Sequence, residues 1–137
     1  MALLGIVLVA LNLRTAVAAI SPIVTEIGAD IPLSTVGLGV LGMLPPVCFA
    51  LFGILTPLAT RGASLEFVTT VALVAILLGH LLRAASTSFT MLVVASIVVF
   101  AGMSVGNVLL PPLVKRYFPD RIGVVTSLYA TVISVST

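Results

Sequence analysis

The sequence predicts an all-α protein, a polytopic bundle of transmembrane helices with four complete spans and a truncated fifth. Three observations predict this fold class. Of the 137 residues, 61% are hydrophobic and 7% are charged, whereas a soluble domain carries about a quarter charged residues. The apolar residues form runs long enough to cross about 30 Å of hydrocarbon. The connections between these runs are short, so neighbouring helices are expected to be antiparallel.

The first predicted span covers residues 2–27 and contains Arg14 near its middle, about 20 Å from either end. No positive charge precedes this run, and the hydrophobicity continues past the small residues at 16–18. We therefore interpret it as a retained span and not as a secretory signal. An arginine at a helix centre costs about 2.5–3.5 kcal/mol on insertion, which the surrounding apolar side chains outweigh. Such a cost calls for a functional reason.

The next predicted spans are 33–60, 65–85 and 89–114, and the fifth is 122–137. Ser34 and Ser88 precede the second and fourth spans and are expected to cap them. The fifth run has 16 residues, fewer than the ~20 that a span needs, so we expect the sequence to stop inside a helix. Bends are expected where prolines remove backbone donors, in the second span and at the end of the fourth: Pro45, Pro46, Pro57, Pro111 and Pro112.

The orientation follows from the basic residues of the connections. Arg61, Lys115, Arg116 and Arg121 belong to connections on one side of the predicted bundle, while Arg83 is near the other side. Cytoplasmic loops of membrane proteins carry the excess of lysine and arginine. The prediction is a multi-pass protein of the bacterial plasma (inner) membrane with a cytoplasmic N-terminus and Arg83 as an outer anchor.

The composition also excludes several classes of function. Six basic residues, with a net charge of +2, form no cluster that could bind nucleic acid. The single cysteine, Cys48, cannot form an internal disulfide. No catalytic combination of side chains, phosphate-binding glycine loop or metal-ligand spacing is present. We therefore expect a protein that is not an enzyme and has no cofactor and no metal.

Arg14 is the first candidate functional residue. On a helix it shares a face with Ala10, Ala18, Ser21 and Thr25, which are all small or carry a hydroxyl group, as a cavity-lining face would. The four acidic residues lie at or near the ends of the apolar segments. Three interpretations stay open: contact with an anionic or polar solute, pairing with a residue outside this sequence, and extension of the side chain to water.

Two further groups of polar residues allow alternatives. Gly102 and Gly106 have the spacing of close helix packing, and Asn107 either hydrogen-bonds between helices or lines a solute path. His80 lies one turn before Arg83. This histidine could relay protons, since its ordinary pKa is near 6.5, or could simply be an interfacial residue in contact with water.

Several stretches together resemble the cyanate and nitroimidazole permease family of the major facilitator superfamily. The more specific motifs are Asn12-Leu13-Arg14 and the block GNVLLPPLVKRYFPDR at 106–121. The resemblance implies a secondary transporter of twelve helices in two halves, with residues 1–137 as a partial N-terminal transmembrane domain. It also implies that Arg14 faces the central cavity, and we count Asn12 with Arg14 and Asn107 among the candidate solute-binding residues. The connection after the second span departs from the superfamily pattern, because it keeps only Arg61, Gly62 and a displaced Glu66.

The sequence therefore predicts a fragment of a transporter for a small anionic or polar solute. Its expected partners are the lipid bilayer, the solute and, through His80, protons. The alternative is a small multidrug-type exporter or a structural membrane protein that assembles from several copies. In small multidrug exporters the charged residue of the first span is acidic, whereas here it is Arg14.

Overall fold

The computed structural model describes residues 1–18, 32 and 34–135, and the side chains of 1–11, 32 and 34–135. The described residues form helices joined by short connections and contain no strand, which confirms the all-α prediction for this part of the chain. The elements are α1 (Ala2–Ala18), α3 (Thr35–Ala59), α4 (Leu65–Ala84), α5 (Phe89–Tyr117), the 3-10 turn η1 (Pro119–Arg121) and α6 (Ile122–Val135).

Three of these helices, α3, α4 and α5, are long and apolar enough to cross a membrane. They correspond to the second, third and fourth predicted spans. Helix α1 has 17 residues and α6 has 14, which is shorter than a span. The remainder of the first predicted span, from residue 19 to 27, lies outside the described residues. Four complete spans followed by a truncated fifth therefore stay a prediction.

Serine side chains cap the starts of the three long helices. The hydroxyl oxygen of Ser34 accepts a hydrogen bond from the backbone N–H of Gly37 at 3.1 Å. That of Ser88 accepts one from Met91 at 3.3 Å. These caps confirm the two predicted helix starts. Ser64, which was not among the predicted caps, caps α4 in the same way. Each cap satisfies one of the free donors at a helix start.

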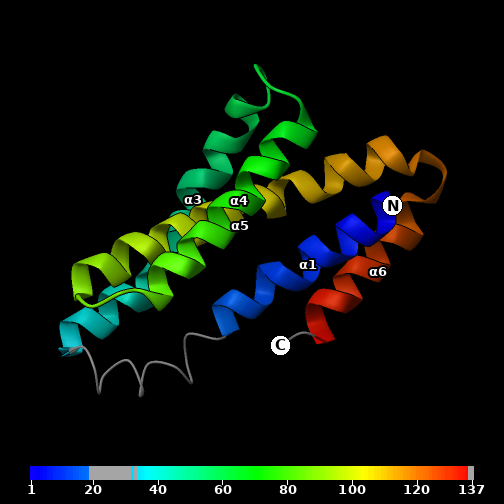
Figure 1. The fold of residues 1–137 in the computed structure, drawn as a ribbon. Coiled ribbons are helices and arrows are strands. Elements are labelled where there is room, and N and C mark those ends of the chain that lie inside the picture. Colours follow the sequence, from blue (N-terminus) through cyan, green and yellow to red (C-terminus); the bar gives the residue numbers. More distant parts are fainter. Residues whose placement is uncertain (19–31, 33, 136–137) are drawn as a thin grey trace.

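Helix α5 is the centre of the structure (Figure 1). It packs against α4, α3 and α1, and α6 packs mainly against α1. The largest fully buried side chains come chiefly from α5, including Phe100, Met103 and Leu110. Helices α3 and α4 follow one another in the chain but make few contacts with each other. The core is therefore organised around one helix.

Two glycines bring α4 and α5 into close contact. A β-carbon on Gly102 of α5 would lie 2.6 Å from the carbonyl oxygen of Ala72 and 2.7 Å from Cγ1 of Ile76. A β-carbon on Gly79 of α4 would lie 2.6 Å from Cγ2 of Val99. Each glycine thus leaves room for a branched side chain of the facing helix. This reciprocal fit explains why α4 and α5 can pack so closely.

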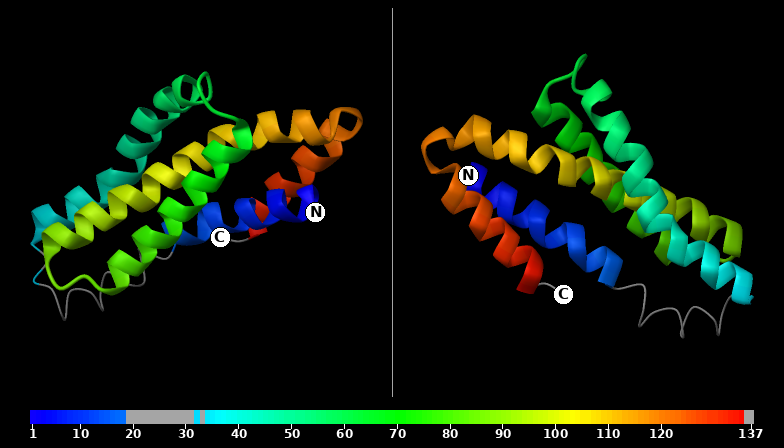
Figure 2. Two further views of the ribbon diagram at one scale, coloured as in Figure 1. Left: turned by 45° about the horizontal axis from the view of Figure 1, so that its top comes forward. Right: turned by 180° about the vertical axis from the view of Figure 1, so that it is seen from behind.

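The prolines lie inside helices and do not end them. Pro111 and Pro112 are within α5, which continues to Tyr117, three residues beyond the predicted end at 114. Lys115 and Arg116, predicted to lie in a connection, are therefore in the last turn of this helix. Prolines remove backbone donors and crowd the carbonyls four residues earlier, so a helix can bend there and then resume. Figure 2 shows α5 changing direction in its C-terminal third.

Three segments lie toward one end of the bundle: the start of α1, the connection between α3 and α4, and the connection between α5 and α6 (Figures 1 and 2). Two observations establish this. Glu66 in the first turn of α4 contacts Arg116 in the last turn of α5. Ala2 of α1 and Tyr117 of α5 line the same pocket. Helices α1 and α4 therefore run opposite to α5, and the four basic residues of the predicted cytoplasmic connections share this end.

Candidate functional site

A pocket of about 600 Å³ lies between α1, α4 and α5 at the end of the bundle where α1 begins. Most of its lining is apolar, with Ile6 and Val9 from α1, Leu73 from α4, and Leu110 and Leu113 from α5. The polar part of the lining is confined to four side chains: Glu66, Thr69, Thr70 and Tyr117. The site therefore offers a long apolar surface with a polar mouth.

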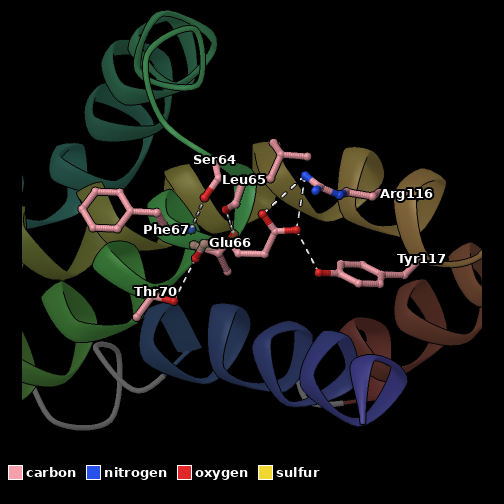
Figure 3. Close-up of polar contacts among 8 residues, drawn as sticks. Ser64, Leu65, Glu66, Phe67, Thr70, Arg116 and Tyr117 are labelled. Atoms are coloured by element: carbon pink, nitrogen blue, oxygen red, sulfur yellow. Dashed lines mark hydrogen bonds and ion pairs between the residues drawn. The ribbon is translucent and has the colours of Figure 1, made fainter.

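Glu66 is the centre of the polar mouth (Figure 3). The phenol of Tyr117 donates a hydrogen bond to Glu66 Oε1 at 2.8 Å. The guanidinium Nη1 of Arg116 lies 3.3 Å from the same oxygen and 3.4 Å from Oε2. The positions suit the helix dipoles, since an acid in the first turn of α4 and a base in the last turn of α5 are both favoured. The cluster joins α4 to α5 at this end of the bundle.

The two threonines beside Glu66 bind their own helix. Thr69 Oγ1 donates to the carbonyl of Leu65 at 2.7 Å, and Thr70 Oγ1 donates to the carbonyl of Glu66 at 2.8 Å. Because each hydroxyl proton is used, the threonines can offer the pocket only the lone pairs of their oxygens. The two hydroxyl oxygens can therefore accept hydrogen bonds from a bound molecule that carries hydrogen-bond donors.

Asn107, predicted to contact solute or to join helices, lies on α5 with its side chain exposed. The adjacent Gly106 is buried. A hydrogen bond between α5 and α3 is made by Ser104, whose hydroxyl donates to the carbonyl of Phe49 at 3.3 Å. Ser104 was not among the predicted residues. It lies two residues from Gly102 and therefore on another side of α5, toward α3, so the spacing of Gly102 and Gly106 did not identify it.

Asn12 and Arg14 belong to α1, and the structure describes their backbone but not their side chains. Ser21 and Thr25, predicted to share the face of Arg14, also lie outside the described residues. The cavity-lining face of the first span therefore stays a prediction.

His80 has a defined hydrogen bond. Its Nδ1 lies 2.9 Å from the carbonyl oxygen of Ile76, one turn earlier on α4. A carbonyl only accepts, so this contact fixes the proton of neutral His80 on Nδ1 and leaves Nε2 as the free acceptor. Within the described part of the chain, no group of three His, Cys, Asp or Glu side chains could hold a metal ion.

No family model and no solved structure matches the chain. Two curated proteins do. The uncharacterised transporter YycB of Bacillus subtilis is 34% identical over 132 residues, which is 96% of this chain and 32% of that protein. The 2-nitroimidazole transporter of Escherichia coli is 32% identical over 126 residues, which is 92% of this chain and 32% of that protein.

The chain is a membrane protein with transporter homologues. It spans about a third of the length of the curated relatives it matches. The apolar helices agree with this relationship, because α3, α4 and α5 each have the length and composition of a membrane span.

Proposed function

We propose that residues 1–137 form part of the N-terminal transmembrane domain of a secondary active transporter in the bacterial plasma (inner) membrane, with a cytoplasmic N-terminus. We assign the transporter to the cyanate and nitroimidazole permease family of the major facilitator superfamily. The main support is the similarity of nearly the whole chain to two proteins that are named as transporters. The collection of Arg61, Lys115, Arg116 and Arg121 at one end of the bundle supports the orientation.

The solute of this transporter is a small anionic or polar molecule. Arg14 provides a charge and a planar fork of donors inside an apolar segment, and such a fork suits an anion or a strong acceptor. Asn12 precedes it by two residues, and Asn107 adds an amide from the exposed side of α5. These three residues bind the solute near the midplane, and rocking of the two halves moves it across the membrane.

Uptake measurements with the longer protein test this proposal. Arg14→Lys keeps the charge but loses the fork, so we expect a partial loss of affinity. Arg14→Gln keeps only amide hydrogen bonds and should lose about 1.5–3 kcal/mol, or about 10- to 150-fold in affinity. Arg83→Gln is the matched control, because it removes an arginine from the last turn of α4, which is not among the proposed solute-binding residues. Uptake is normalised to the protein present in the membrane.

Unchanged affinity in Arg14→Gln would make this arginine structural and would contradict the site assignment. A second measurement addresses the alternative function. Purified 137-residue chain in liposomes should show no saturable uptake above empty vesicles. Saturable uptake by this chain alone would instead favour the small exporter that assembles from several copies.

A further inference from the structure

Ser96 on α5 carries a buried hydroxyl group without a partner. Its side chain keeps 1% of its surface exposed, and its Oγ atom makes no hydrogen bond within the described part of the chain. Other hydroxyl groups donate to the carbonyl four residues earlier on their own helix, as those of Thr69 and Thr70 do. A buried hydroxyl without a hydrogen bond is costly, so native structures normally avoid it. Ser96 therefore calls for an explanation.

Contacts between α3 and α5 give the level at which Ser96 lies. A β-carbon on Gly37 would lie 3.1 Å from Cε2 of Phe89. A β-carbon on Gly53 would lie 3.9 Å from Oγ of Ser104, so the two helices run in the same direction. The facing residues differ in number by 52 (89 minus 37) or 51 (104 minus 53). Position 96 of α5 therefore lies opposite positions 44 and 45 of α3.

Pro45 leaves a backbone acceptor at the same level. Because proline has no N–H, Pro45 cannot donate to the carbonyl of Leu41, four residues earlier. Helix carbonyls point toward the C-terminal end, so that of Leu41 points toward the level of Pro45. Leu41 is buried, and among the described helices α3 packs chiefly on α5. A donor without an acceptor and an acceptor without its helical donor thus lie at one level of the α3–α5 contact.

We propose that Ser96 donates a hydrogen bond to the Leu41 carbonyl in a second conformation, in which the segment of α3 before Pro45 tilts toward α5. This inference rests on the proposed function, since alternating access requires more than one conformation. Two adjacent prolines allow the tilt, because the helix lacks the two backbone hydrogen bonds that would resist it. The structure shows the conformation in which the bond between Ser96 and Leu41 is open.

Pro46 provides a matched comparison. It removes the donor for the carbonyl of Gly42, which is an exposed residue. A β-carbon on Gly42 would meet nothing within 4 Å, so this side of α3 faces away from α5. Replacing Pro45 by alanine returns a donor to the Leu41 carbonyl and removes the acceptor that Ser96 needs. Replacing Pro46 by alanine returns a donor only to Gly42 and leaves that acceptor free.

Distance measurements between spin labels, by double electron–electron resonance in the longer protein, test the inference. In a cysteine-free background, the first pair of labels is attached to Val36→Cys, before the prolines of α3, and to Leu81→Cys on α4. These positions are 77% and 58% exposed, so labels fit there. The reference pair joins Leu81→Cys to Ile54→Cys, which lies after the prolines and is 72% exposed. Uptake is measured on the same variants without labels.

The expected result is two distances for the first pair and one for the reference pair. Ser96→Ala and Pro45→Ala should each lower the population of the second distance several-fold, and their combination should add nothing to either alone. Uptake should fall several-fold in both variants, because one conformation of the cycle is lost. Pro46→Ala should keep both distances and the uptake.

A single distance for the first pair in the parent protein, with uptake intact, would overturn the inference alone and assign the hydroxyl to a buried water molecule. Equal effects of Pro45→Ala and Pro46→Ala, or unchanged distances in Ser96→Ala, would also overturn it. Two distances that respond as expected, in a parent protein without saturable uptake, would refute the proposed function and keep the hydrogen bond between α5 and α3.

Discussion

Replacing Gly102 by alanine is a direct test of the α4–α5 packing. The new β-carbon would lie 2.6 Å from the carbonyl oxygen of Ala72, whereas ordinary contact begins near 3.4 Å. The helices would therefore have to separate by about 0.8 Å. A backbone oxygen cannot move aside by a rotamer change, and the core of the structure lies along this contact.

The expected cost combines two opposing effects. Overpacking a close contact costs about 1–3 kcal/mol, and a backbone obstacle belongs in the upper part of that range. Alanine gains about 1 kcal/mol over glycine in helix propensity. The net loss in the free energy of unfolding is therefore about 1–2 kcal/mol. Gly42→Ala is the matched control, because a β-carbon there meets nothing within 4 Å, so only the favourable propensity effect remains.

The protein provides its own probe for this measurement. Cys48 is the only cysteine and is buried on α3. A maleimide that becomes fluorescent on reaction with its thiol will report unfolding as detergent-solubilised protein is heated. Gly102→Ala should react at a temperature several degrees lower than the parent protein, and Gly42→Ala should not. Equal transition temperatures for Gly102→Ala and the parent would refute the close contact between α4 and α5.

The facing glycine allows a second comparison. A β-carbon on Gly79 would first meet a side-chain atom, Cγ2 of Val99. Gly79→Ala should therefore be destabilising alone and partly rescued by Val99→Ala, which removes the obstructing methyl group. Gly102→Ala should not be rescued by Ile76→Ala, because the backbone oxygen of Ala72 remains. Equal rescue of both glycine variants would contradict this difference.

Three other predictions concern the ends and the centre of the bundle. Ser104→Ala removes the hydrogen bond to α3 and should cost about 0.6 kcal/mol in the same thermal assay; no change would show that the bond contributes nothing. Glu66→Gln should leave the transition temperature unchanged because its ion pair with Arg116 is exposed, and a loss as large as that at the α4–α5 glycine would contradict this expectation. Single cysteines at Ser86 and Lys115, in a cysteine-free background, should react with an impermeant maleimide in intact cells only at 86; reaction only at 115 would reverse the proposed orientation.

The sequence predicted the helix starts better than the arrangement of the helices. Ser34 and Ser88 are recognisable because capping depends on a few neighbouring residues. The end of α5 was predicted three residues early because the apolar run ends at 114, before Lys115 and Arg116, whereas the helix continues to Tyr117. The central position of α5 was not predicted. Helices α3, α4 and α5 are similarly apolar, and hydropathy alone cannot distinguish a helix that faces lipid from one that faces other helices.

In the candidate site, too, features set by neighbouring residues could be predicted, whereas contacts between distant residues could not. The small-residue spacing at Gly102 pointed to helix packing, but its partner Gly79 depends on the register between α4 and α5. The contact of Glu66 with Tyr117 joins residues that are 51 positions apart. Nothing in the local sequence of either residue identifies the other. Such contacts follow only from how the helices are placed.

The central position of α5 also has a consequence for biosynthesis. Helices α3 and α4 leave the ribosome before α5, yet they make few contacts with each other and both pack on α5. Until α5 has been translated, α3 and α4 lack the helix that is their main partner among the described helices. We expect nascent chains that stop before Phe89 to remain unassembled and open to membrane proteases, and resistance to begin once α5 has entered the membrane. The translation of one helix would thus set the time at which this part of the protein can fold.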